Sequence, residues 1–193
     1  PHLAGLVAAR PGLRVPGAWD GFELAVRAIL GQQITVAAAT RLAGRLVALY
    51  GAPLAEPQGG LSHVFPPPER LAGADLALAL GMPRARGAAL HGMALAAAAD
   101  PRLFAPGQGL EEAIARLVAL PGIGEWTAQY IAMRALREPD AFPAADIGLM
   151  RAMATAEGRP TAKALLARAE AWRPWRAYAA LHLWASEAPA QEK

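Results

Sequence analysis

The sequence predicts an all-α protein. Apolar residues recur at helical spacing along almost the whole 193-residue chain, and no segment shows a convincing strand alternation. The length fits one compact domain or two closely packed lobes. No apolar run approaches the roughly 18 residues that a membrane span needs, and no signal peptide opens the chain. We therefore expect a helical, soluble, intracellular protein.

The composition excludes several classes of chemistry. Cysteine is absent, which rules out disulfides, thiolate zinc sites, cysteine nucleophiles and iron–sulfur clusters. The four histidines show no metal-ligand spacing: His2, His63, His91 and His182. Lys and Arg number 19 against 16 Asp and Glu, and every cation except Lys163 and Lys193 is arginine. Arginine suits bidentate phosphate contact, but a GC-rich genome enriches it too, so a net charge of +3 leaves nucleic acid as only one candidate partner.

The first long helix begins at Asp20, where Glu23 three residues later completes a capping-box pattern. An apolar stripe follows at positions i, i+4, i+7 and i+8: Phe22, Val26, Ile29 and Leu30. Residues 31–33 (Gly-Gln-Gln) interrupt this helix, and a second one is expected over residues 35–50. Residues 52–68 are rich in proline and glycine and are expected to form a loop.

Glycine and proline divide the rest of the chain into further helices. We expect them over residues 68–80, 83–99, 110–119, 125–137, 146–153, 160–170 and from 174 onward. Pro139 ends the helix before it, because the residue preceding a proline avoids the helical region. Asp146 can cap the next helix, and Pro174 suits the first position of the last one.

The most informative segment is residues 110–137, which reads helix, Leu-Pro-Gly-Ile-Gly, helix. Pro121 fixes one φ angle, whereas Gly122 and Gly124 permit positive φ and remove side chains that would block close approach. The first amides of the following helix lack internal partners and, with the helix dipole, form an anion site. Nothing in the turn reads a base, so a nucleic-acid phosphate is the expected ligand. An ordinary tight turn between antiparallel helices is the structural alternative.

The segments LPGIGEWTAQYIAMRAL and DAFPAADIGLMRAM resemble the helix-hairpin-helix (HhH-GPD) DNA glycosylase superfamily, and most closely its DNA-3-methyladenine glycosylase II (AlkA) type. Three further stretches extend the likeness over most of the chain: RPGLRVPGAWDGFELAVRAILGQQITVAAA, LGMPRARGAAL and WRPWRAYAALHLW. The resemblance implies two helical lobes flanking a DNA-binding cleft. The central lobe is residues 21–138, with the hairpin at 110–137, and the second is residues 1–20 plus 139–193. Full-length relatives carry an N-terminal β-rich domain, which we expect to be absent from this chain.

Asp146 occupies the position of the family's catalytic carboxylate. A fixed carboxylate stabilises the oxocarbenium character that develops on the sugar, or positions water to attack C1′. Its competing interpretation is a helix cap alone. The resemblance also implies an aromatic base pocket formed by Trp126, Tyr130 and Trp184. Ring faces attract cationic alkylated purines, although aromatics at helical spacing are more often core residues.

The resemblance further implies DNA-phosphate contacts at Gly122, Gly124 and Thr127, and a DNA wedge at Gln33. Relatives of the AlkA type place a leucine at the wedge, so Gln33 is a departure, and a plain loop residue is its alternative. Ile147 replaces an aromatic residue after the catalytic Asp in the best-known relatives. These two departures leave the lesion range open.

Trp126 stands where superfamily members that also nick the backbone carry a Schiff-base lysine. We therefore expect a monofunctional glycosylase without AP-lyase activity. No cofactor is required, but backbone carbonyls of the hairpin are candidates to hold Na⁺ or K⁺: Val118, Leu120 and Ile123.

The sequence thus predicts a base-excision repair glycosylase that flips out alkylated bases, such as 3-methyladenine, and hydrolyses their N-glycosidic bond. Two alternatives stay open: a glycosylase for a deaminated or mismatched base, and a non-catalytic helix-hairpin-helix DNA-binding module. The presence of Asp146 with Trp126 and Tyr130 argues against the module. The expected partner is double-stranded DNA with damaged bases and no membrane. We expect a monomer in the bacterial cytoplasm, associated with the nucleoid.

Overall fold

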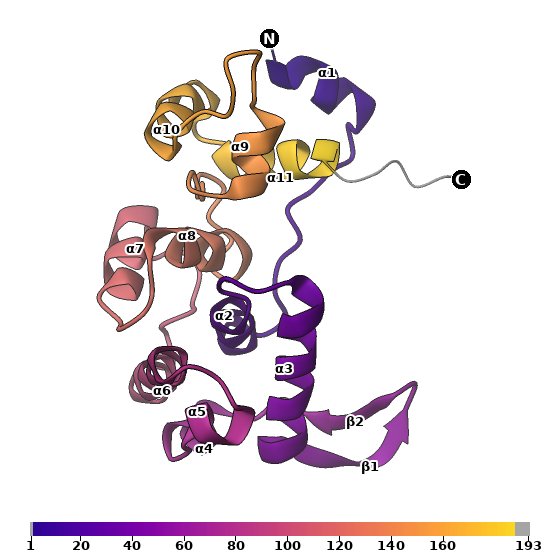
Figure 1. Ribbon diagram of the computed structural model, residues 1–193, viewed down its shortest axis with the longest axis vertical. Helices are drawn as coiled ribbons and strands as arrows, with labels where there is room; N and C mark the ends of the chain where they lie inside the picture. Colours follow the sequence, from indigo (N-terminus) through magenta and orange to yellow (C-terminus); the bar gives the residue numbers. More distant parts are fainter. Residues whose placement is uncertain (1, 188–193) are drawn as a thin grey trace.

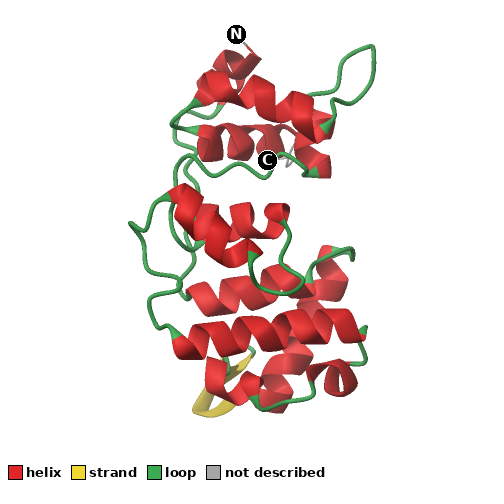
Figure 2. Cartoon of the chain, turned by 90° about the vertical axis from the view of Figure 1, so that its left-hand side faces the viewer, coloured by secondary structure: helices red, strands yellow, loops and turns green. Residues whose placement is uncertain are grey.

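The computed structural model describes residues 2–187, which form a stack of helices with one small strand hairpin at the end (Figures 1 and 2). The helices are α1 (His2–Ala9), α2 (Gly21–Leu30), α3 (Val36–Tyr50), α4 (Pro68–Ala72), α5 (Leu76–Leu80), α6 (Arg84–Ala99), α7 (Leu110–Val118), α8 (Glu125–Arg134), α9 (Ile147–Ala152), α10 (Ala162–Ala169), the short 3₁₀ helix η1 (Glu170–Trp172) and α11 (Arg176–Glu187). The prediction of a helical fold is confirmed. The predicted lobe of residues 1–20 plus 139–193 includes residues 1 and 188–193, which lie outside the described range. Within that range, no helix is long and apolar enough to cross a membrane.

Side-chain caps start the helices where the sequence predicts them. Asp20 accepts a hydrogen bond from the amide of Glu23 at 2.8 Å, and this bond begins α2. Thr35 caps α3 in the same way. These bonds satisfy amides that have no partner inside the helix.

The expectation of a loop over residues 52–68 is wrong. Strand β1 (Ala52–Gln58) pairs antiparallel with β2 (Leu61–Val64) around the turn Gly59-Gly60. Both glycines have positive φ, 56° and 84°, which suits a two-residue hairpin turn. Almost every residue of the two strands is exposed, so neither strand shows the apolar alternation of a half-buried sheet. In the sequence, the feature that indicates this strand hairpin is the Gly59-Gly60 pair.

Other element boundaries also differ from expectation. The segment 68–80 is broken at Gly73 into two short helices, α4 and α5. Helix α8 ends at Arg134 and not at 137, and Arg137 adopts a φ of 61°. The last helix begins at Arg176, two residues later than predicted, and α1 was not predicted at all.

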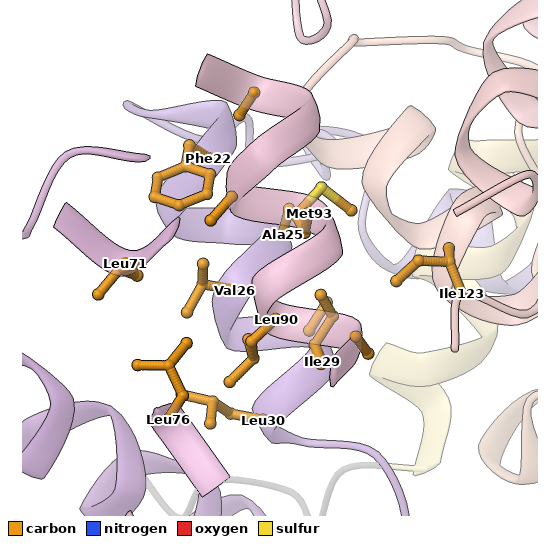
Figure 3. Packing of buried hydrophobic residues seen from close by; sticks show 14 of the residues in the cluster. Phe22, Ala25, Val26, Ile29, Leu30, Leu71, Leu76, Leu90, Met93 and Ile123 are labelled. Atoms are coloured by element: carbon orange, nitrogen blue, oxygen red, sulfur yellow. The ribbon is translucent and has the colours of Figure 1, made fainter. Parts of the chain in front are cut away.

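The first hydrophobic cluster packs α2 against α3, α4, α5 and α6 (Figure 3). The predicted stripe of α2 lies at its centre, and Val26, Ile29 and Leu30 are completely buried. In Figure 3 these side chains face Leu90 and Met93 of α6. Burial of this stripe holds α2 in place, which fixes the loop that follows it.

The second hydrophobic cluster joins α7, α8, α9, α10 and α11. Helix α8 belongs to both clusters: Ala128 and Ile131 pack in the first, whereas Ala132 and Met133 pack in the second. In Figure 1, α8 accordingly lies between α2 and the pair α9 and α11. The helix that follows the Leu-Pro-Gly-Ile-Gly turn is therefore held on two sides.

Candidate active site

Asp146 is the N-cap of α9. Its Oδ1 accepts a hydrogen bond from the amide of Leu149 at 2.9 Å, which is the capping role that the sequence predicts. Asp146 itself has extended backbone angles, and its side chain is only half-buried. The cap leaves Oδ2 and one lone pair of Oδ1 for other partners.

Two tryptophans from distant helices occupy those positions. Trp126 Nε1, on α8, donates to Oδ2 of Asp146 at 2.9 Å, and Trp184 Nε1, on α11, donates to Oδ1 at 2.8 Å. Indole N–H groups only donate, so both present a fixed donor to the carboxylate. Three donors from three helices therefore fix the position and the orientation of this carboxylate.

Gly148 makes the approach of Trp184 possible. A Cβ at this position would lie 3.0 Å from Oδ1 of Asp146 and 3.3 Å from Cδ1 of Trp184. Gly148 was not among the predicted site residues. Its signal was its place in a helix only two residues after a candidate catalytic Asp, where a glycine weakens the helix.

An aromatic pair on α8 borders a cavity. Trp126 and Tyr130 stack with ring centroids 5.3 Å apart and planes only 7° from parallel. Both rings line a cavity of about 420 Å³ between α2, α3 and α8, which we call the α8 cavity. Trp184 does not line this cavity and instead contacts Asp146. The indole of Trp126 therefore links the cavity to the carboxylate.

Arg134 completes the same face of α8. Its Cζ lies 5.6 Å from the centroid of the Tyr130 ring, and its Nη1 lies 3.4 Å from the Tyr130 hydroxyl. Its backbone carbonyl accepts from the amide of Ala18 at 2.8 Å, which ties the incoming N-terminal segment to α8. Arg134 also lines the α8 cavity, and sequence reasoning missed it. The sequence does indicate this role, because Trp126, Tyr130 and Arg134 follow one another at the spacing i, i+4 and i+8.

The two glycines of the hairpin turn have different roles. Gly122 has a φ of 75°, and a Cβ there would lie 2.7 Å from Cβ of Ala89 on α6. Gly124 has a φ of −87°, which any residue adopts, and a Cβ there would meet nothing within 4 Å. The expectation of positive φ is thus confirmed for Gly122 and wrong for Gly124. The missing Cβ of Gly122 serves the packing of the turn on α6.

The amides at the start of α8 have no side-chain cap, because Gly124 is the N-cap residue. Thr127 is 3% exposed, and its hydroxyl accepts a hydrogen bond from Gln32 Nε2 at 3.1 Å. Its side chain is therefore already used inside the protein, where it joins the loop after α2 to α8.

Gln32 connects the loop after α2 to the hairpin. Besides Thr127, its Nε2 donates to the carbonyl of Gly122 at 3.1 Å, and its own carbonyl accepts from Arg86 Nη2 at 2.6 Å. The neighbouring Gln33, the candidate wedge, is exposed and has a φ of 59°. Gln32 and Arg86 thus hold the base of the loop that presents Gln33.

An ion-pair network anchors the chain that leads to Asp146. Arg176, which is 4% exposed, donates to both carboxylate oxygens of Asp140 at 2.8 and 2.9 Å and to Glu170 at 3.1 Å. Arg173 binds the same two carboxylates, and its hydrogen bond lowers the pKa of the exposed Glu170. A bidentate guanidinium fixes both partners, so residue 140 is tied to α11.

No group of three or more His, Cys, Asp or Glu side chains able to hold a metal ion occurs within residues 2–187. Of the carbonyls proposed for a monovalent cation, that of Val118 belongs to the last residue of α7, and those of Leu120 and Ile123 lie in the turn. That of Leu120 accepts from the amide of Ile123 at 3.2 Å, which leaves it a second lone pair.

Comparison with known proteins places this site in a family context. A family model described as HhH-GPD superfamily base excision DNA repair protein matches residues 26–177, which include the hairpin and Asp146. A Mycobacterium tuberculosis protein described as a probable bifunctional transcriptional activator/DNA repair enzyme AlkA is 43% identical over 200 residues, covering 100% of this chain and 40% of the relative. DNA-3-methyladenine glycosylase 2 of Escherichia coli is 42% identical over 187 residues, covering 96% of this chain and 64% of the relative.

The fold has a close counterpart among solved structures. The 3-methyladenine DNA-glycosylase from Archaeoglobus fulgidus superposes with a TM-score of 0.78 at 26% identity, covering 96% of this chain and 65% of that one. The chain spans less than two thirds of the length of each of these three proteins. Because the family model matches well over half of the residues, the chain belongs to the HhH-GPD superfamily of base excision DNA repair proteins.

Proposed function

We propose that the protein is a DNA glycosylase that excises alkylated bases such as 3-methyladenine and leaves an abasic site. The observation that carries this proposal is the Asp146 carboxylate, which the indoles of Trp126 and Trp184 hold beside the α8 cavity. A non-catalytic DNA-binding module has no need of a carboxylate fixed by three donors. Relatives named as DNA-3-methyladenine glycosylases support the substrate class.

The arrangement suits cleavage of an N-glycosidic bond. As the bond between C1′ and the base nitrogen lengthens, positive charge develops on the sugar, and a fixed carboxylate opposite it stabilises that charge. Asp146 can also orient a water molecule toward C1′. An alkylated purine already carries positive charge, so it departs as a neutral base and needs no strong general acid. The stacked faces of Trp126 and Tyr130 suit such a cation.

The hairpin would bind double-stranded DNA through its backbone. Uncapped amides at the start of α8, together with the helix dipole, favour a phosphate at the Gly124 end. Gln33, at the tip of the loop that Gln32 anchors, would enter the space left by the flipped base. We place the protein in the bacterial cytoplasm, since the relatives named above from M. tuberculosis and E. coli are bacterial. Our proposal also takes it to act as a monomer.

We also propose that a monovalent cation binds at the hairpin, although the chemistry does not require it. Na⁺ or K⁺ would be held by the carbonyls of Val118, Leu120 and Ile123 and would add positive charge beside the bound phosphate.

The test of the proposal is Asp146→Asn. Loss of the negative charge should reduce release of 3-methyladenine from methylated DNA by at least about a hundredfold, in line with the loss of one electrostatic stabiliser. Binding to DNA with an abasic site should stay close to that of the unchanged protein. Chromatography of the released bases and fluorescence anisotropy measure the two quantities.

A matched control separates catalysis from capping. Asp75 is also an N-cap carboxylate, which accepts from the amide of Leu78 at 3.1 Å. Asp75→Asn should keep full excision activity. Excision by Asp146→Asn at the rate of the Asp75→Asn control would leave Asp146 with the capping role alone.

The proposal includes the absence of AP-lyase activity. Position 126, where a lyase would need an amine, holds an indole whose N–H is bonded to Asp146. Borohydride should therefore trap no covalent adduct between the protein and abasic DNA. Lys163, on α10, supplies an amine within the described residues, while Lys193 lies outside them. A trapped adduct that disappears in Lys163→Arg would overturn this assignment.

A further inference from the structure

The α8 cavity contains a positive charge that the excision of cationic bases does not explain. Trp126, Tyr130 and Arg134 follow one another at i, i+4 and i+8, so they lie in a row along one face of α8, and all three line the cavity. The guanidinium of Arg134 lies 5.6 Å from the Tyr130 ring centroid. A cationic base in the same cavity would be repelled by this charge.

The guanidinium of Arg134 is incompletely satisfied. Among residues 2–187, its buried Nε has no hydrogen-bond partner, and its side chain makes one hydrogen bond, the 3.4 Å contact to the Tyr130 hydroxyl. No carboxylate of the described residues forms an ion pair with it. The Nη2 group forms no hydrogen bond with the described residues and is not fully buried, so it can donate to an acceptor that a ligand supplies.

Arg27 provides the contrast within the same cavity. It also lines the cavity, but its guanidinium is paired with Glu23, at 2.6 Å from Nη2 and 2.7 Å from Nε to the same oxygen. Its charge is therefore largely compensated. Of these two cavity arginines, Arg134 is the one with hydrogen-bonding capacity and charge left for a bound base.

We propose that Arg134 is a specificity-determining residue that promotes excision of lesions whose base departs with negative charge, such as hypoxanthine. The inference rests on the proposed glycosylase function and extends it to neutral lesions that carry a ring carbonyl. The carbonyl oxygen of such a base would accept a hydrogen bond from the Arg134 guanidinium.

The chemistry of the two lesion classes differs in charge. When a neutral base leaves, the bond between C1′ and the base nitrogen breaks, and the electron pair stays on the base, which becomes an anion. Water then supplies hydroxide to C1′, and the proton of that water neutralises the base. When a cationic alkylated base leaves, the same electron pair neutralises its charge. The charge on the base falls by one unit in both cases, so the guanidinium lowers the barrier from the bound complex alike, by attracting the departing anion or by relieving the repulsion of the bound cation. Measured from free protein and DNA, it stabilises only the transition state of the neutral lesion, because the cationic lesion loses in binding what it regains on departure.

The experiment compares kcat/KM for excision of hypoxanthine and of 7-methylguanine from otherwise identical duplexes. In Arg134→Gln, the ratio of kcat/KM for hypoxanthine to kcat/KM for 7-methylguanine should fall about tenfold, which corresponds to roughly 1.4 kcal/mol in the activation free energy measured from free protein and DNA. Arg134→Lys keeps the charge and should restore much of the ratio. Arg27→Gln, the matched control, should affect the two rates alike. Circular dichroism checks that each variant is folded, and Arg134→Met serves as the second neutral variant if Arg134→Gln is not.

An unchanged ratio in the neutral Arg134 variants, whether or not both rates fall, would overturn the inference and leave Arg134 as a packing partner of Tyr130. Excision of 7-methylguanine but not hypoxanthine by the unchanged protein would also overturn it, with the proposed function intact. Excision of neither lesion would overturn the inference, and it would refute the proposed function as well only if the protein also released no 3-methyladenine from methylated DNA.

Discussion

The carboxylate of Asp146 accepts three hydrogen bonds from within the described part of the protein. The amide of Leu149 and the two indoles of Trp126 and Trp184 come from three different helices. A carboxylate held in this way does not have to reorganise when positive charge develops on the sugar, and such preorganised groups provide most of the stabilisation in many enzymes. The residue therefore depends on its neighbours for its effect.

Trp184→Phe tests this dependence at the level of one donor. The phenyl ring keeps most of the apolar contact but removes the Nε1–H that donates to Oδ1 of Asp146 at 2.8 Å. Since a hydrogen bond to a charged group contributes about 1.5–3 kcal/mol, we expect the single-turnover excision rate to fall about tenfold or more. The affinity for DNA should hardly change.

The control for that substitution is Trp175→Phe. Trp175 is 58% exposed and stacks edge-on against Tyr178, away from Asp146. It should keep the excision rate of the unchanged protein. Equal rates in the two variants would show that the indole bond from Trp184 does not orient the carboxylate.

The turn between α7 and α8 has two functions, and each depends on a different glycine. Gly122 allows the positive φ and the close packing against Ala89 of α6, whereas Gly124 leaves the N-terminal amides of α8 uncovered. Folding and DNA contact can therefore be separated by mutation within three residues.

Gly122→Ala should destabilise the fold by about 1–3 kcal/mol, because it combines a left-handed backbone with overpacking against Ala89. Gly124→Ala should leave the free energy of unfolding nearly unchanged, since its Cβ meets nothing within 4 Å. It should still weaken binding to all duplexes, damaged or not, because phosphate contacts carry no base information. Urea titration and fluorescence anisotropy measure the two effects.

Each of the two glycine variants serves as the control for the other. Normal DNA affinity in a folded Gly124→Ala protein would remove the phosphate-binding role from the start of α8. A change in lesion preference would assign the turn to the base pocket.

At the scale of the whole molecule, α1 is packed against α11 (Figure 1), so that the N-terminal segment closes onto the C-terminal helix. His182 of α11 is 7% exposed, and its Nδ1 has no hydrogen-bond partner. Burial, followed by the positive charge of Arg10, lowers the pKa of His182 below the ordinary value of 6.5. The folded state therefore prefers the neutral imidazole.

This preference predicts a loss of stability in acid. Below pH 6.5 the unfolded chain binds the proton and the folded protein does not, so the free energy of unfolding falls as the pH drops from about 6.5 toward the lowered pKa. Above pH 6.5 the contribution is fully present. Thermal unfolding between pH 7.5 and 5.5 should show this slope, and His182→Gln should reduce it. The exposed His91 of α6 is the control. An equal slope in His182→Gln and His91→Gln would exclude His182 as the source.

Local patterns in the sequence were enough to predict the α2 stripe, the caps at Asp20 and Asp146 and the positive φ of Gly122, because each depends on residues a few positions apart. The strand hairpin was not predictable by alternation, since its strands are exposed on both faces. The bonds of Gln32 reach 90 and 95 residues along the chain, and no periodicity encodes such contacts. Family resemblance indicated Asp146 and its tryptophans, but it did not reveal that both indoles donate to the carboxylate.

The position of α8 in both hydrophobic clusters has a consequence for how the protein would search DNA. The amides that would hold a phosphate lie at the first turn of α8. Three of the side chains that line the cavity, those of Trp126, Tyr130 and Arg134, lie along the same ten-residue helix, a rod of about 15 Å. Both groups belong to one continuous helix, so the distance between the bound phosphate and the cavity is fixed. A phosphate bound at the start of α8 would therefore determine which nucleotide faces the cavity. The protein would then examine one nucleotide position of a duplex at a time. Moving to the next nucleotide would require release of the phosphate, so the lifetime of the phosphate contact would limit the rate of the search.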